Sequence, residues 1–254
     1  MKPQQSVLLI IMSLCLLFGS MGINPPVWAG VTVDHGIYAL LLNKYVKDGL
    51  VDYRGFKTEE DKLDQYLELL EKIDSENLLF NEQFAFYINA YNAWTIKLIL
   101  MGYPGVKSIK DLGSIFKSPW KKKICRINGT IMTLNDIEHK ILRPGFQDPR
   151  VHFAINCASI GCPPLIPNPY TGSILDQQLN SSARAFINDP AKNYFDGTTL
   201  YLSKIFKWFA KDFNNDIIGF IRKYADGNLG ERLVNKQGTI MIKYLDYDWS
   251  LNGI

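Results

Sequence analysis

The sequence predicts an α+β fold in which helices pack on a small, mostly antiparallel sheet. Residues 81–101 carry apolar side chains on nearly every face, a pattern typical of a central helix buried on most sides. An Asn-Gly pair at 128–129 lies between alternating residues and predicts a β-hairpin over 124–133. Helical patterns dominate the first half and strand patterns come mostly later, which favours α+β over a regular βαβ repeat.

Apolar residues recur at helical spacing in six further segments. We expect these helices over residues 34–47, 58–73, 133–141, 175–188, 203–213 and 217–224. Asp34, Asn81 and Ser203 are residue types that cap helix N-termini. Short extended segments are expected over residues 51–53, 150–156, 199–202 and 239–244. No Ser/Gly linker or repeat interrupts these elements, so they should form one domain.

The first 29 residues have the pattern of a secretory signal peptide. Lys2 supplies the positive start, residues 7–18 form an apolar run, and Val27-Trp28-Ala29 suits cleavage after Ala29. The apolar run is short for a membrane span. We therefore expect an exported protein with a mature domain over 30–254 and no membrane association after cleavage. The periplasm, a thylakoid lumen and the extracellular medium all fit this pattern.

The charge balance and the missing motifs narrow the class of protein. There are 28 basic and 25 acidic residues, and losing Lys2 with the signal leaves 27 − 25 = +2, so we expect no nucleic-acid partner. The sequence has no G-x-S-x-G, phosphate-binding glycine loop or H-E-x-x-H motif, which argues against serine α/β-hydrolases, nucleotide enzymes and zincins. His139 and His152 lack zinc-ligand spacing, and we expect no metal or other cofactor.

The mature chain has three cysteines, and two of them lie close together in sequence. An odd number leaves at least one thiol unpaired in the monomer. Cys157 and Cys162 fit a small disulfide loop, a pair of inert thiols, or a nucleophile activated by His152. On a regular strand His152 and Cys157 point to opposite faces. The reactive alternative therefore needs a turn at Asn156, or a return of Cys162 toward His152.

Polar residues mark two further candidate regions of a site. Asn89 and Asn92 lie in the buried helix and need partners, because an unpaired buried amide costs about 1–3 kcal/mol. They either bond a neighbouring loop and fix the core, or face a ligand. Glu138 and Asp248 are the acids that we expect to orient a histidine.

Four sequence motifs carry a resemblance to a known family. They are Phe-Tyr-Ile-Asn-Ala-Tyr-Asn-Ala at 86–93, Leu-Asn-Asp-Ile-Glu-His at 134–139, the stretch from Asp-Pro-Arg-Val-His to Gly-Cys-Pro at 148–163, and Tyr-Asp-Trp-Ser-Leu-Asn at 247–252. In this order they resemble the domain-of-unknown-function 547 family, from about residue 51 to the C-terminus. The element order is also similar to papain-like and transglutaminase-like folds, whose nucleophilic cysteine lies near the start of the central helix. This chain has Asn89 and Asn92 there instead.

These observations lead us to expect a thiol-dependent hydrolase or transferase that acts on an amide bond in a peptide or small molecule. Cys157 is the expected nucleophile, His152 the base, Glu138 or Asp248 the orienting acid, and Asn92 an oxyanion donor. The residues expected to contact the substrate are Asn89, Asn92, Asn156, Ser159 and Cys162. One alternative is a non-catalytic domain that binds a peptide or small molecule, and another is a redox protein that cycles Cys157 and Cys162.

Overall fold

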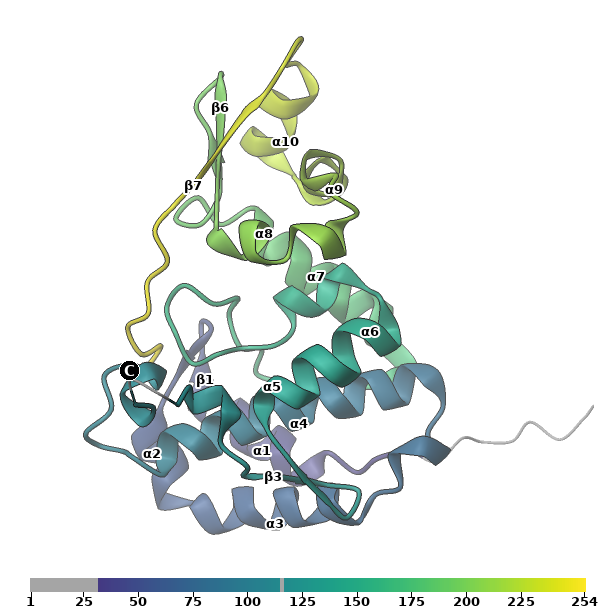
Figure 1. Cartoon of the computed structure of the whole chain (residues 1–254), viewed down its shortest axis with the longest axis vertical. Helices are drawn as coiled ribbons and strands as arrows, with labels where there is room; N and C mark the ends of the chain where they lie inside the picture. The colour runs from purple at the N-terminus through teal and green to yellow at the C-terminus, as the bar shows by residue number, and fades with distance from the viewer. Residues whose placement is uncertain (1–31, 115–116) are drawn as a thin grey trace, which may run out of the picture.

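The computed structural model describes residues 32–114 and 117–254 and has the expected α+β fold (Figure 1). The expected signal peptide lies outside the described residues. Within the described part of the chain, no helix is long and apolar enough to cross a membrane. Buried apolar side chains form two clusters, called here the first core and the second core.

The first core surrounds helix α4 (Phe80–Leu100), which is buried on nearly all sides as its sequence predicted. The chain reaches α4 through α1 (Gly36–Tyr45), β1 (Val46–Lys47), β2 (Leu50–Val51), α2 (Tyr53–Thr58) and α3 (Glu60–Lys72). α3 has one apolar face, formed by its leucines and Tyr66, and it packs that face inward. In Figure 1 these helices occupy the lower half of the molecule.

The predicted hairpin at 124–133 is confirmed. Strands β3 (Cys125–Ile127) and β4 (Thr130–Met132) pair antiparallel, and Asn128 and Gly129 both have the positive φ that a type I′ turn requires. Thr133 and Asp136 then form a reciprocal capping box that starts the next helical run. That run begins as α5 (Leu134–Asp136), passes through a π-helical turn (Ile137–Leu142) and ends as α6 (Arg143–Phe146).

The strand predicted over 150–156 is wrong. The chain forms a 3-10 helix, η5 (Pro149–Phe153), with Asp148 as its N-cap. Pro149 needs no hydrogen-bond partner at the first helical position, and the Asp148 carboxylate accepts from the Arg150 backbone N–H at 2.9 Å. Residues 151–156 are all buried, so their apolar character did not distinguish a strand from a helical turn.

The second core is built mostly from elements that follow η5. They are α7 (Leu175–Ile187), β5 (Tyr194–Phe195), β6 (Thr199–Leu202), α8 (Lys204–Trp208), the 3-10 helix η7 (Ala210–Phe213), α9 (Ile217–Tyr224), α10 (Gly227–Val234) and β7 (Met241–Tyr244). Of these, α7 contributes to both cores, with Leu175 and Leu179 in the first core. The bounds predicted for β6 and α9 are confirmed. β5 pairs antiparallel with β6, but β7 pairs parallel with β6, so the described sheets are small and only mostly antiparallel.

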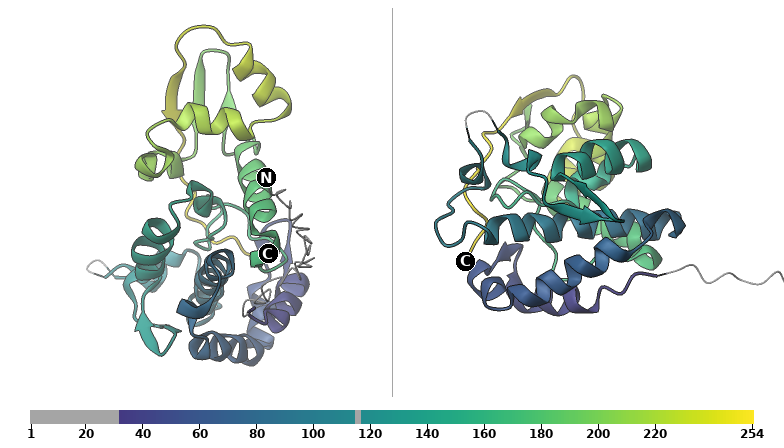
Figure 2. Two further views of the ribbon diagram at one scale, coloured as in Figure 1. Left: turned by 90° about the vertical axis from the view of Figure 1, so that its right-hand side faces the viewer. Right: turned by 60° about the horizontal axis from the view of Figure 1, so that its bottom comes forward.

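The C-terminal segment connects the elements of the second core with those around the first core. After β7 it descends from the elements of the second core to the lower half, as both Figure 1 and the left view of Figure 2 show. There Val51 N–H donates to Asn252 O at 2.9 Å, and Leu251 N–H donates to Lys107 O at 2.8 Å. Leu251 also forms a β-bridge with Ser159. The segment therefore passes beside the Cys157–Cys162 loop on its way.

Candidate functional site: an aromatic pocket between the two cores

A pocket of about 260 Å³ lies where the two cores meet. One wall comes from α4, the π-helical turn and the loop at 118–120, and the other from α8 and the C-terminal segment. The polar lining residues include Glu138, His139 and His152, and both Cys157 and Cys162 also line it. The pocket therefore brings together three of the four predicted catalytic residues, although they lie in separate short elements.

Four large aromatic residues form a cluster in the apolar wall of the pocket. Trp249 lies at the centre of this cluster, with ring centroids 5.8 Å from Trp120, 5.8 Å from Trp208 and 4.5 Å from Tyr247. Trp208 belongs to α8 and is 46% exposed, so it stands at the mouth. Stacked and tilted aromatic rings offer a large apolar contact area with little conformational freedom to lose. Sequence reasoning missed this cluster, because its members are up to 129 residues apart, from Trp120 to Trp249.

Glu138 is a buried acid at the inner wall. The π-helical turn places Glu138 and His139 side by side at the pocket, and such turns occur often at functional sites. The Tyr91 hydroxyl donates to Glu138 Oε2 at 3.3 Å. Burial raises the pKa of Glu138 to about 7, although Arg143 and the Tyr91 hydrogen bond act in the opposite direction. Near neutral pH this carboxyl group is therefore often protonated and able to donate a hydrogen bond.

His152 is held by an acid that the sequence did not suggest. Its Nε2 lies 2.8 Å from Asp212 Oδ2, and its ring stacks on Phe209 at a centroid distance of 3.9 Å. Asp212, from η7, also accepts from Arg143 Nε at 2.6 Å and Nη2 at 2.9 Å. The expected partners of His152, Glu138 and Asp248, are not the ones it bonds. Nothing in the local sequence marks Asp212, which lies 60 residues after His152.

The hydrogen bonds around Asp212 also define the protonation of both histidines. Hydrogen bonds from His152 and Arg143 hold the pKa of Asp212 below its ordinary value, so it is a carboxylate acceptor. Burial lowers the pKa of His152, so its ring is neutral and donates through Nε2–H, which leaves Nδ1 as a base. Arg143 Nη1 lies 2.9 Å from His139 Nδ1, which must accept because guanidinium only donates. Burial and the Arg143 charge also lower the pKa of His139.

Cys157 and Cys162 are joined in a disulfide, one of the three arrangements that the sequence allowed. A disulfide sulfur carries no thiolate, so Cys157 is not a nucleophile in this oxidised form, and that role stays a prediction for the reduced protein. The remaining cysteine of the described chain, Cys125, is buried. Burial raises the pKa of its thiol well above the ordinary value, which makes it a poor nucleophile.

The two asparagines of α4 bond the chain itself. Asn92 Nδ2 donates to Ala154 O at 3.0 Å, and Asn92 Oδ1 accepts from Asn156 N–H at 2.8 Å. Asn89 similarly clamps Tyr170, donating to its carbonyl at 2.7 Å and accepting from its N–H at 2.9 Å. Neither asparagine lines the pocket, so the interpretation in which they fix neighbouring loops accounts for these contacts.

The other predicted ligand contacts also have structural partners. Asn156 Nδ2 donates to Pro163 O at 2.7 Å, and its Oδ1 accepts from Ala158 N–H at 2.7 Å, which shapes the disulfide loop. The Ser159 hydroxyl lies 3.2 Å from the Tyr247 hydroxyl, just behind the two sulfurs. Asp248 accepts from Ser250 N–H at 2.8 Å and is exposed. Of the predicted substrate contacts, Cys162 alone is among the residues that line the pocket.

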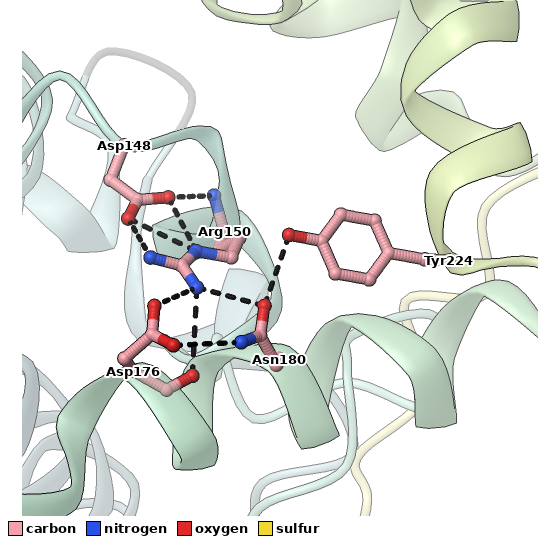
Figure 3. Close-up of polar contacts among 5 residues, drawn as sticks. All are labelled: Asp148, Arg150, Asp176, Asn180 and Tyr224. Atoms are coloured by element: carbon pink, nitrogen blue, oxygen red, sulfur yellow. Dashed lines mark hydrogen bonds and ion pairs between the residues drawn. The ribbon is translucent and has the colours of Figure 1, made fainter.

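Arg150 fixes the helix that carries His152 (Figure 3). Its guanidinium bonds both oxygens of Asp148, with the shortest distance 2.6 Å from Nη2 to Oδ2. Nη1 reaches α7, donating to Asp176 Oδ1 at 2.6 Å and Asn180 Oδ1 at 2.8 Å. Asn180 in turn accepts from the Tyr224 hydroxyl of α9 at 3.1 Å. Arg150 thus anchors η5 to two helices of the second core.

Replacing Arg150 with methionine should lower the free energy of unfolding by about 2 kcal/mol, because the Asp148 and Asn180 oxygens lose charged hydrogen bonds in a half-buried position. Arg184→Met is the matched control. Its ion pair with Asp226 is about half exposed on both sides, so the loss should be below about 1 kcal/mol. Urea unfolding followed by tryptophan fluorescence measures both values. Equal losses for the two variants would show that Arg150 is no anchor.

The fold and the pocket define an α+β protein with an aromatic pocket that is lined by a disulfide, a buried acid and a histidine held by an aspartate behind it. Residues 75–187 match the family model described as "Protein of unknown function, DUF547". The resemblance expected from the motifs is confirmed over that segment. The matched segment includes Glu138, His152 and both bridged cysteines. Asp212 and the pocket wall formed by α8 and the C-terminal segment lie outside the matched segment. No curated protein and no solved structure matches the chain.

Proposed function

We propose that this chain is exported and that its aromatic pocket binds a peptide or another small molecule that carries an amide group. The observation that carries this proposal is Glu138, a carboxyl group that is 8% exposed, lines the pocket and has a pKa raised to about 7. In its neutral form it donates a hydrogen bond to a ligand carbonyl, as other acids in apolar sites do. The disulfide supports the export part of the proposal, because such bonds persist in oxidising compartments.

The charge of the pocket also favours an uncharged, amide-like group. Arg143, whose charge acts on Glu138, is already paired with Asp212, and the two histidines are neutral. An anionic ligand would therefore find no unpaired cation among these groups, and the neutral Glu138 would meet a carbonyl without leaving a buried charge. The tryptophan and tyrosine rings would pack on an apolar side chain next to that carbonyl.

A second function is hydrolysis or transfer at the bound amide bond by the reduced protein. The His152–Asp212 pair favours it, because an oriented neutral histidine with a free Nδ1 is the base that a thiol nucleophile needs. Both His152 and Cys157 line the same pocket. This activity would require reduction of the disulfide. It would be seen as release of amine from a peptide only in the presence of reductant, and loss of that release in His152→Ala.

The binding proposal predicts a pH dependence that belongs to one residue. N-acetylphenylalaninamide, an uncharged probe with an amide and one aromatic ring, should bind about tenfold more weakly at pH 8 than at pH 6, because Glu138 ionises through a pKa of about 7. Glu138→Gln keeps a donor that does not titrate, so its affinity should be the same at both values. Isothermal titration calorimetry at millimolar probe measures the four dissociation constants.

Glu76→Gln is the matched control, since Glu76 is an exposed acid that does not line the pocket. It should keep the tenfold change of the original chain. The proposal fails if the probe does not bind at either pH, or if the tenfold change survives in Glu138→Gln.

A further inference from the structure

The two sulfurs of the pocket disulfide have different surroundings. Both sulfurs contact the same two hydroxyls: Tyr247 lies 3.2 Å from Cys157 Sγ and 3.1 Å from Cys162 Sγ, and Ser159 lies 3.1 Å from Cys157 Sγ and 3.6 Å from Cys162 Sγ. Cys162 Sγ also accepts from the Cys157 backbone N–H at 2.8 Å. Hydrogen bonds to a thiolate stabilise its charge and lower the pKa of the thiol. The backbone N–H gives Cys162 a donor beyond the two shared hydroxyls, so Cys162 is the sulfur better placed to carry a negative charge.

The two sulfurs also differ in exposure, and here Cys157 is the more accessible one. Cys162 is 5% exposed, whereas Cys157 is half-buried and faces the pocket. A thiol that enters the pocket would therefore reach Cys157 first. In thiol–disulfide exchange the reaction is fast when the attacked sulfur is accessible and the leaving sulfur has a low pKa. Cys157 meets the first requirement, because it is accessible, and Cys162 meets the second, because it is the better stabilised leaving sulfur.

The loop between the cysteines is held in place by contacts that do not involve sulfur. Ala158 has a φ of 59°, a left-handed conformation that is unusual for alanine, and Asn156 Oδ1 fixes its N–H. Gly161 N–H donates to Asp248 O at 2.8 Å, and an added Cβ there would lie 2.9 Å from both the Asp248 carbonyl and the Tyr247 ring. The loop should therefore keep the two cysteines close together after the disulfide opens.

We propose that the Cys157–Cys162 disulfide exchanges with a thiol bound in the pocket, a cysteine-containing peptide or a small amide-bearing thiol. The ligand thiolate attacks Cys157 Sγ and forms a mixed disulfide with it. The bond between Cys157 and Cys162 breaks, and its electron pair leaves on Cys162 Sγ, where the Cys157 N–H and the Tyr247 hydroxyl hold the thiolate. A second thiol can then attack the ligand sulfur, releasing the oxidised ligand and leaving both cysteines reduced.

The substrate class rests on the proposed function, because the same pocket would hold the amide next to the reacting thiol.

Tyr247 is the residue on which this mechanism can be tested. Burial raises the pKa of its hydroxyl, so this group stays protonated and acts as a hydrogen-bond donor. It lies within 3.2 Å of both sulfurs.

The test uses the oxidised full-length mature protein and reduced glutathione, a thiol that carries two amide bonds. After brief incubation, free thiols are alkylated with iodoacetamide and the digested protein is analysed by mass spectrometry. We expect glutathione on Cys157 and the alkyl group on Cys162. Tyr247→Phe should slow the formation of the mixed disulfide about tenfold, because the leaving thiolate loses a hydrogen bond. Tyr244→Phe, on β7 and outside the pocket lining, should react at the original rate.

Three outcomes would overturn the inference. The first is a disulfide that reacts with glutathione only after denaturant is added, and the second is glutathione attached to Cys162 instead of Cys157. The third is an equal rate for Tyr247→Phe and Tyr244→Phe when both variants unfold at the same urea concentration as the original chain. Binding of N-acetylphenylalaninamide, which has no thiol, is measured in parallel. Binding without exchange removes this inference alone, and exchange without binding removes the proposed amide pocket alone.

Discussion

Replacing Asn92 with leucine should lower the free energy of unfolding by about 3 kcal/mol. Leucine fills a similar volume, so no large cavity forms, but the Ala154 carbonyl and the Asn156 N–H lose the hydrogen bonds that Asn92 supplies. Both residues are about 5% exposed. A buried backbone group without a partner costs about 1–3 kcal/mol, and two such groups give the expected total. Chemical denaturation in urea measures the loss.

Asn43→Leu is the matched control for this substitution. Asn43 is also a helical asparagine with two hydrogen bonds, to Ala39 O and Asn168 Oδ1, but it is exposed. Water can replace both bonds, so the change should stay within about 0.5 kcal/mol. If Asn92→Leu were equally mild, the contacts between α4 and the chain at 154–156 would not determine the position of the disulfide loop.

The sequence predicted elements well where one local rule was sufficient. The apolar surface of α4 identified a buried central helix, and Asn128-Gly129 identified the hairpin, because only a few residues can adopt both positive φ angles of its turn. The sequence also showed that the asparagines of α4 need partners. It could not show which partners they have, because Ala154 and Tyr170 are brought to α4 by packing and not by sequence distance.

The errors have a common physical origin. The run of buried residues over 151–156 fits a strand, but Pro149 and the Asp148 cap favoured a helical turn that buries the same residues. The predicted strand places His152 and Cys157 on opposite faces, whereas the helical turn brings His152, Cys157 and Cys162 to one pocket. Asp212 and the tryptophans could not be predicted as partners, since their proximity depends on how the second core and the C-terminal segment pack against the first core.

The stability of this protein at mildly acidic pH should depend strongly on His35. This residue precedes α1 and is 5% exposed, with Nδ1 2.7 Å from the Tyr66 hydroxyl and Nε2 3.2 Å from Asn89 Nδ2. The Asn89 amide nitrogen can only donate, so His35 Nε2 must accept and the ring must be neutral. Burial accordingly lowers the pKa of His35 from 6.5 to about 4.

This shift has a definite sign. Between pH 6.5 and 4 the unfolded chain binds a proton at His35 that the folded chain does not, so stability falls as the pH falls through that range. Glu138 acts in the opposite direction, because its pKa rises from 4.5 to about 7 on folding and stability falls as the pH rises through that range. In the original chain the two effects partly cancel. The contribution of His35 is therefore best measured in the Glu138→Gln background, where the opposing effect is absent.

In that background, lowering the pH from 7 to 5 should remove about 2 kcal/mol of unfolding free energy through His35. Between pH 7 and pH 5, the double variant Glu138→Gln/His35→Gln should lose about 2 kcal/mol less unfolding free energy than Glu138→Gln alone. This difference does not depend on how stable the double variant is at pH 7. The lowered pKa values of His139 and His152 also make the protein less stable in acid, but this effect is the same in the single and the double variant. Urea unfolding at pH 5 and pH 7 gives the four free energies. Identical losses in the single and double variants would mean that His35 can take up a proton in the folded protein, and that its hydrogen bond from Asn89 does not keep the ring neutral.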